Sequence, residues 1–194
     1  MKKYIAEVLG TGALTLVVAL SLKIGFVVAT PVLAALVLML FVYSIGHVSG
    51  SHINPAVTMG LWSIGKVKPA EALMYIIAQC IGAFVAMSVV SSTVGIAPLT
   101  VVNSLAVFGA EFLGTFFFTF GIASAVYGKT PQDASGLVVG GSLLLGITIA
   151  ALLGSNGVLN PAVAFGIGSL NLAYVFGPIV GSIIGMRMYK FLAH

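Results

Sequence analysis

The sequence predicts an all-α membrane protein with six transmembrane helices, two re-entrant half-helices and an inverted internal repeat. Three observations predict this class: long apolar stretches, scarce charge and a repeated pair of motifs. Of 194 residues, 60% are hydrophobic and only 6% are charged, and the mean hydropathy is +1.20. Since a soluble domain carries roughly 25% charged residues, most of this chain's outer surface must face lipid.

Six apolar stretches reach or approach the roughly 20 residues that a helix needs to cross the hydrocarbon core. We expect the spans at residues 4–22, 31–48, 69–91, 104–127, 136–153 and 172–192. Nothing in the chain resembles a separable soluble module. We therefore expect a single membrane domain over residues 1–194.

Two shorter segments begin at Asn54 and Asn160 and run for roughly ten residues each, too short to span as helices. Each begins Asn-Pro, which suits a helix start because asparagine caps the end and proline fits the first turn. The stretches before them, 47–53 and 154–159, are expected to be non-helical. At membrane depth, such backbone is tolerated only inside protein or along a water-filled cavity.

An internal repeat relates the two halves. Residues 6–11 read Ala-Glu-Val-Leu-Gly-Thr and residues 110–115 read Ala-Glu-Phe-Leu-Gly-Thr, an offset of 104. Asn-Pro-Ala-Val occurs at 54–57 and again at 160–163, an offset of 106. Each repeat, approximately 1–95 and 104–194, holds three spans, so the second copy must be inverted. Inverted repeats that meet at the midplane are a recurrent plan for transport sites.

The basic residues predict the orientation. If six spans alternate, Lys23 lies on one side and seven basic residues lie on the other: Lys2, Lys3, Lys66, Lys68, Lys129, Arg187 and Lys190. The positive-inside rule then puts both termini in the cytoplasm. Because the chain is compact, without long tails or a cleavable signal, we expect a prokaryotic inner membrane.

Two half-helices that meet end to end would each point a partial positive charge at the midplane and repel cations there. Asn54 and Asn160 would each present an amide donor to a permeating oxygen. Half-helix dipoles and polar lining groups are means by which membrane pores select. The pattern therefore predicts a passive pore for uncharged molecules.

The run 46–58, Gly-His-Val-Ser-Gly-Ser-His-Ile-Asn-Pro-Ala-Val-Thr, resembles the first Asn-Pro-Ala loop of the aquaporin and glycerol-facilitator superfamily. The Ala-Glu-x-x-Gly-Thr openings of the first and fourth spans also resemble that family. The resemblance implies an aquaporin-like fold with one pore per subunit and a homotetramer in the lipid bilayer. The pore motifs would be Asn54, Pro55, Ala56, Asn160, Pro161 and Ala162.

The resemblance also implies roles for three titratable residues. Glu7 and Glu111 match glutamates that brace the pore loops, in agreement with the cost of an unpartnered carboxylate within a span. His52 would lie near the cytoplasmic pore mouth. Two interpretations of His52 stay open, a lining or pH-sensitive gating residue and a structural hydrogen bond within the loop.

The family's outer filter takes four positions, which spacing from the motifs puts at Ala34, Thr148, Gly157 and Val163. Most members carry an arginine where this chain has Val163. The filter should therefore be wide, so that glycerol, urea, ammonia or neutral metalloid hydroxides pass as well as water. The alternatives are a strictly water-selective aquaporin and a gradient-coupled secondary transporter.

Other function classes find little support. Enzymes gather titratable or nucleophilic groups at one site, whereas Glu7 and Glu111 are repeat mates, and no phosphate loop, zinc motif or hydrolase elbow is present. The eight basic residues form no patch for nucleic acid. We expect no enzyme activity, no cofactor and no metal site.

Overall fold

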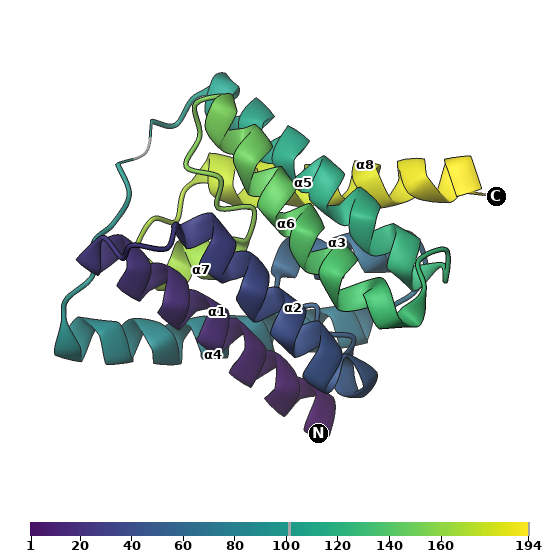
Figure 1. Ribbon diagram of the computed structural model, residues 1–194, viewed down its shortest axis with the longest axis horizontal. Coiled ribbons are helices and arrows are strands. Elements are labelled where there is room, and N and C mark those ends of the chain that lie inside the picture. Colours follow the sequence, from purple (N-terminus) through teal and green to yellow (C-terminus); the bar gives the residue numbers. More distant parts are fainter. Residues whose placement is uncertain (101, 194) are drawn as a thin grey trace.

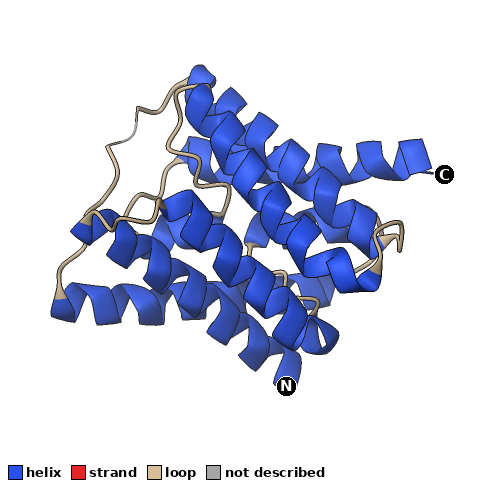
Figure 2. Cartoon of the chain, in the orientation of Figure 1, coloured by secondary structure: helices blue, strands red, loops and turns tan. Residues whose placement is uncertain are grey.

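The computed structural model describes residues 1–100 and 102–193, and helices joined by loops make up this part of the chain (Figures 1 and 2). Six helices are long and apolar enough to cross a membrane. Their bounds are α1 Lys2–Ile24, α2 Thr30–Ser49, α4 Pro69–Thr93, α5 Leu105–Val126, α6 Ser135–Leu152 and α8 Leu172–Ala193. The predicted six-span class is thus confirmed, with ends that differ from the expected ones by a few residues.

Two half-helices follow the Asn-Pro motifs, α3 Pro55–Ser63 and α7 Pro161–Gly166, and a short 3₁₀ turn, η1 Gln132–Ala134, precedes α6. The second half-helix, at 6 residues, is shorter than the roughly ten expected. Gly168, just beyond it, adopts the left-handed conformation with φ of 70°, which favours glycine and turns the chain out of helical geometry.

Glycines let the spanning helices approach closely. The stripe Gly177, Gly181 and Gly185 on α8 faces α5, and a methyl group on any of them would collide with an α5 backbone carbonyl. Gly82 on α4 faces α1 in the same way, where a methyl group would overlap the carbonyl oxygen of Val8. Such contacts are typical of helix packing in lipid, where small residues bring backbones together.

Each half-helix packs against the last helix of the opposite half. Helix α3, from the first half, lies against α8, and α7, from the second half, lies against α4. In Figure 1 both short helices lie among the long ones. This exchange brings the N-termini of α3 and α7 together, which places the two Asn-Pro-Ala motifs next to each other.

Candidate functional site

Asn54 and Asn160 each cap a half-helix and bind the loop of the other half. The side-chain oxygen accepts from the backbone N–H two residues later, at 2.8 Å for Asn54 and 3.0 Å for Asn160. The amide nitrogen of Asn54 donates to the carbonyl of Leu159 at 2.9 Å, and that of Asn160 to the carbonyl of Ile53 at 3.0 Å. Since an amide nitrogen carries two hydrogens, each asparagine keeps one donor for a molecule between them.

The residues before the two asparagines have unusual backbone conformations. Ile53 has φ of 38° and Leu159 has φ of 52°, in the left-handed region that non-glycine residues rarely adopt. Such conformations cost about 1–3 kcal/mol each and persist only where the surroundings fix them. Here the carbonyls of both residues accept the asparagine amides, and their N–H groups bind the two buried glutamates.

Glu7 on α1 binds the first loop. One carboxylate oxygen accepts from the Ser49 hydroxyl at 2.8 Å and from the N–H of His52 at 3.0 Å. The other accepts from the N–H of Ile53 at 2.7 Å and from the Gln79 amide at 2.8 Å. The side chain is fully buried. Four donors converge on one carboxylate, so Glu7 ties α1, α2, the loop and α4 together.

Glu111 on α5 does the same for the second loop. It accepts from the Ser155 hydroxyl, from the N–H of Val158 at 3.0 Å and from the N–H of Leu159 at 2.8 Å. It too is fully buried. The serine is also a repeat mate of Ser49, since its hydroxyl accepts from a backbone N–H two residues later. Both loops are therefore held by a serine and a glutamate in equivalent positions.

A cavity of about 240 Å³ adjoins the asparagines. Its wall is largely apolar, formed by α1, α2, α5 and α6, and the loop residues and asparagines complete it. No Asp, Glu, Lys or Arg is among its lining residues in the part of the chain that the structure describes. The polar side chains that line it are Thr30, His52, Asn54, Asn156 and Asn160. The space therefore suits uncharged molecules with at least one hydrogen-bond acceptor.

The four residues expected at the outer filter do not all lie together. Ala34, Gly157 and Val163 line the cavity, but Thr148 lies on the exposed side of α6, where its hydroxyl donates to the carbonyl of Leu144 at 2.8 Å. Ile147 lines the cavity instead. The prediction of Thr148 is wrong because one residue along a helix rotates the side chain by about 100°. Ile147 replaces Thr148 in the candidate filter.

A second cavity, of about 320 Å³, continues the first along the same helices. Three helices contribute to both cavities with residues one turn apart, first cavity then second: Leu38 and Val42 on α2, Phe118 and Ile122 on α5, Leu143 and Val139 on α6. In the loop, His52 lines the first cavity and Ser51 the second. The two cavities therefore meet at the level of His52.

His52 is held in place where the cavities meet. Its side chain is buried, and Nδ1 lies 3.1 Å from the hydroxyl oxygen of Thr58. Thr58 also accepts from the Gln79 amide at 3.0 Å, so a polar chain links Glu7 to His52. His52 lies outside the six spanning helices, and burial lowers its pKa to about 4. The imidazole is therefore neutral at physiological pH.

Sequence reasoning missed the side chains that support the site. Gln79 sits within an apolar span and Thr58 within a half-helix, and neither has a local pattern that marks it. Within residues 1–100 and 102–193, no three His, Cys, Asp or Glu side chains gather as metal ligands would. The two cavities therefore present hydrogen-bonding groups and apolar walls to a permeating molecule.

Comparisons with known proteins agree with this geometry. A family model described as Major intrinsic protein matches residues 1–189. Aquaporin AqpM of Methanothermobacter thermautotrophicus is 34% identical over 90% of this chain and 76% of its own length. Aquaporin NIP1-1 of Arabidopsis thaliana is 31% identical over 98% of this chain and 73% of its own. The X-ray structure of the aquaglyceroporin from Plasmodium falciparum superposes with a TM-score of 0.71 at 20% identity, and covers 98% of this chain and 94% of that one.

Proposed function

The chain belongs to the major intrinsic protein family, and from this premise we propose that its pore passes small uncharged solutes such as glycerol as well as water. It is an integral membrane channel of the aquaporin and aquaglyceroporin type, not an enzyme. The proposal concerns its selectivity. The candidate solutes are glycerol, urea, ammonia and neutral metalloid hydroxides.

One observation carries the proposal. The cavity of about 240 Å³, here called the outer cavity, is lined by four residues of the candidate filter: Ala34, Ile147, Gly157 and Val163. None of them is charged or aromatic. A ring of this composition offers no fixed charge and leaves space that an arginine or an aromatic side chain would fill. Solutes wider than water can therefore enter. Selection against ions falls to the half-helix dipoles and the two asparagine donors.

We also propose the arrangement in the membrane. With six alternating spans, seven of the eight basic residues would fall on one side, which supports a topology with both termini in the cytoplasm. Residues 1–194 would form one channel domain with inverted repeats at about 1–95 and 104–194. The exchange of half-helices between halves and the matching glutamate contacts support this division. A homotetramer with one pore per subunit, in a prokaryotic inner membrane, completes the proposal.

The experiment is stopped-flow light scattering on proteoliposomes shocked with glycerol. Initial shrinkage reports water efflux, and later re-swelling reports glycerol entry. Fast shrinkage with fast re-swelling is the expected result. Fast shrinkage without re-swelling would mean a water-selective pore, and would contradict the open outer ring.

Variants at Val163 test the ring itself. Val163→Arg should narrow the cavity and slow glycerol entry, and Val163→Met should do so without a charge if the arginine variant fails to fold. Val163→Ala, at the same site, removes volume and should leave glycerol entry at least as fast. Equal glycerol entry in folded Val163→Met and Val163→Ala channels would show that Val163 does not limit the solute.

A further inference from the structure

We infer that Tyr75 positions the pore-lining His52 and thereby sets the inner constriction, where the two cavities meet. The inference rests on the proposed function, since a constriction matters only in a conducting pore. Tyr75 lines neither cavity among the described residues, so it would act through the imidazole and not on the solute.

The rings of Tyr75 and His52 are in contact. The centroid of the Tyr75 ring lies 4.5 Å from that of the His52 imidazole, with 36° between the planes. Both side chains are buried, with exposed fractions of 4% and 7%. At this distance the tyrosine ring covers one side of the imidazole and leaves it no space to withdraw in that direction.

The other sides of the imidazole are occupied as well. Nδ1 contacts the Thr58 hydroxyl at 3.1 Å. Gly50 lies so close that a methyl group there would be 3.2 Å from the Cδ2 and Nε2 atoms of His52. Thr58 and Gly50 belong to the first half-helix and its loop, whereas Tyr75 comes from α4. The tyrosine ring therefore holds the imidazole against α4, whereas the backbone N–H of His52 binds Glu7 of α1.

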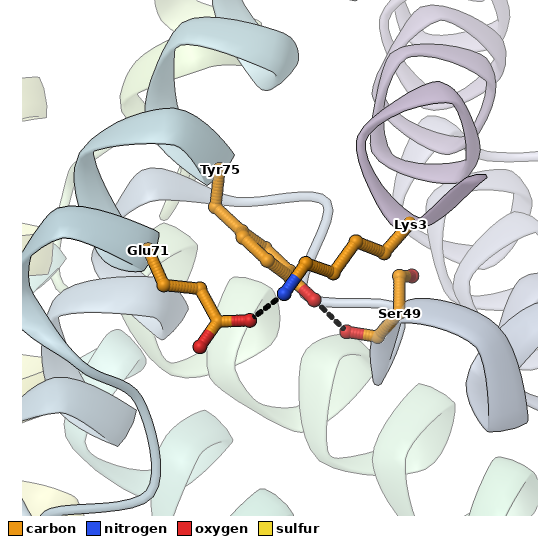
Figure 3. Close-up of polar contacts among 4 residues, drawn as sticks. All are labelled: Lys3, Ser49, Glu71 and Tyr75. Carbon is orange, nitrogen blue, oxygen red and sulfur yellow. Dashed lines mark hydrogen bonds and ion pairs between the residues drawn. The ribbon is translucent and has the colours of Figure 1, made fainter. Parts of the chain in front are cut away.

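Contacts with α1 and α2 hold Tyr75 itself in place. Its hydroxyl donates to the carbonyl of Ser49 at 2.8 Å, at the end of α2 (Figure 3). Tyr4 packs edge-on against its ring at a centroid distance of 5.7 Å. Figure 3 also shows Lys3 reaching from α1 to the carboxylate of Glu71, beside Tyr75. The Lys3 ammonium lies 5.9 Å from the centroid of the Tyr75 ring.

These contacts give the ring and the hydroxyl different tasks. The ring limits where the imidazole can lie, and the hydroxyl holds the end of α2. A leucine at position 75 removes the ring and leaves space beside His52, so the imidazole can move out of the pathway. A phenylalanine keeps the ring and loses only the hydrogen bond. The two variants therefore separate positioning of His52 from general stability.

The experiment measures the ratio of glycerol to water permeability in proteoliposomes. Tyr75→Leu should raise this ratio several-fold, and Tyr75→Phe should keep the wild-type ratio. Should Tyr75→Leu fail to fold, Tyr75→Met supplies a non-planar side chain of larger volume. Tyr4→Leu is the matched control: it makes the same change in a residue that contacts Tyr75 but lines neither cavity.

A double variant tests whether the effect passes through His52. In a His52→Ala channel, adding Tyr75→Leu should leave the permeability ratio unchanged. A shift of equal size in both backgrounds would overturn the inference, as would an unchanged ratio in folded Tyr75→Leu and Tyr75→Met channels. A wild-type protein that conducts neither solute would instead refute the proposed function, so the two failures are distinguishable.

Discussion

The two buried glutamates predict unequal effects of the same mild substitution. Glutamine keeps the shape of glutamate but replaces one acceptor oxygen with an NH₂ group. In Glu7 each oxygen accepts two hydrogen bonds. Whichever way a glutamine at position 7 is turned, its NH₂ group faces one backbone N–H, of His52 or Ile53. It also faces the Ser49 hydroxyl or the Gln79 amide, which can accept it only by turning away from a present contact. In Glu111 one oxygen accepts only the N–H of Leu159, so a glutamine can turn its NH₂ group there and leave a single donor unmatched.

The expected magnitudes follow from the count of unmatched donors. A buried donor without an acceptor costs about 1–3 kcal/mol. Glu111→Gln should therefore lower the free energy of unfolding by about 1–3 kcal/mol. Glu7→Gln should lower it by about 1.5–4.5 kcal/mol, since it also displaces one side-chain hydrogen bond worth about 0.5–1.5 kcal/mol. Glu7→Gln should also lower water permeability, because the unmatched donor is a backbone N–H of the pore loop, at His52 in one orientation and at Ile53 in the other.

The assay is heat-induced unfolding of the purified chain in detergent, followed by far-UV circular dichroism, with water flux measured on the same preparations. Glu71→Gln is the matched control, because Glu71 pairs with Lys3 where both side chains are about one-third exposed. Removing an exposed pair of that kind changes the free energy of unfolding little. A larger loss for Glu111→Gln than for Glu7→Gln, or equal losses in all three variants, would refute the reasoning.

Two further predictions concern the pore wall. Ile147→Ala should speed glycerol entry because Ile147 lines the outer cavity, whereas Thr148→Ala, on the exposed side of α6, should leave it unchanged. The same re-swelling assay checks both variants. Faster glycerol entry in Thr148→Ala than in Ile147→Ala would restore Thr148 to the filter. Water flux should be the same at pH 7.5 and pH 5.5. With a pKa of about 4, His52 stays neutral over that range, whereas at the ordinary value near 6.5 it would become mostly protonated. A change in flux that His52→Ala abolishes would favour a pH-sensitive gate.

The apolar spans and the internal repeat predicted most of the fold. Apolar length alone located the six spans, because a helix in lipid must satisfy its own backbone and keep its surface apolar. The Asn-Pro pairs located the half-helices because capping and proline geometry are local. The length of α7 is shorter than predicted because the residues after Gly166 carry no charge, and Gly168, which turns the chain, is one glycine among 24.

The site was harder to predict where it depends on orientation around a helix. Counting from the motifs gave Thr148, and the structure has Ile147, because a count that is wrong by one residue changes the face. The chain Glu7, Gln79, Thr58 and His52 joins residues up to 72 positions apart. Such contacts arise from helix packing, and single polar residues in apolar spans do not reveal their partners.

The two halves share a frame but differ in what they present to the pore. A glycine of α4 or α8 meets a carbonyl of α1 or α5 at residues 82 and 181, an offset of 99. By that offset Tyr75 corresponds to Tyr174. The Tyr75 hydroxyl donates to the end of α2, whereas the Tyr174 hydroxyl accepts from the Asn156 amide of the second pore loop at 2.7 Å.

The same offset pairs Gln79 with Pro178, and the loop offset of 106 pairs Thr58 with Ala164 and His52 with Val158. The scaffold contacts are thus duplicated, whereas the chain of Glu7, Gln79, Thr58 and His52 has no matching residues in the second half, where the pair of Tyr174 and Asn156 reaches the pathway instead. Since a buried donor left without an acceptor costs about 1–3 kcal/mol, losing any member of this chain exposes the others to the cost of an unmatched group. The pore beside the first loop is therefore the more constrained by hydrogen bonding. Beside the second loop, where Val158 lines the cavity at the position equivalent to His52, the pore is freer to vary in width and thus in solute.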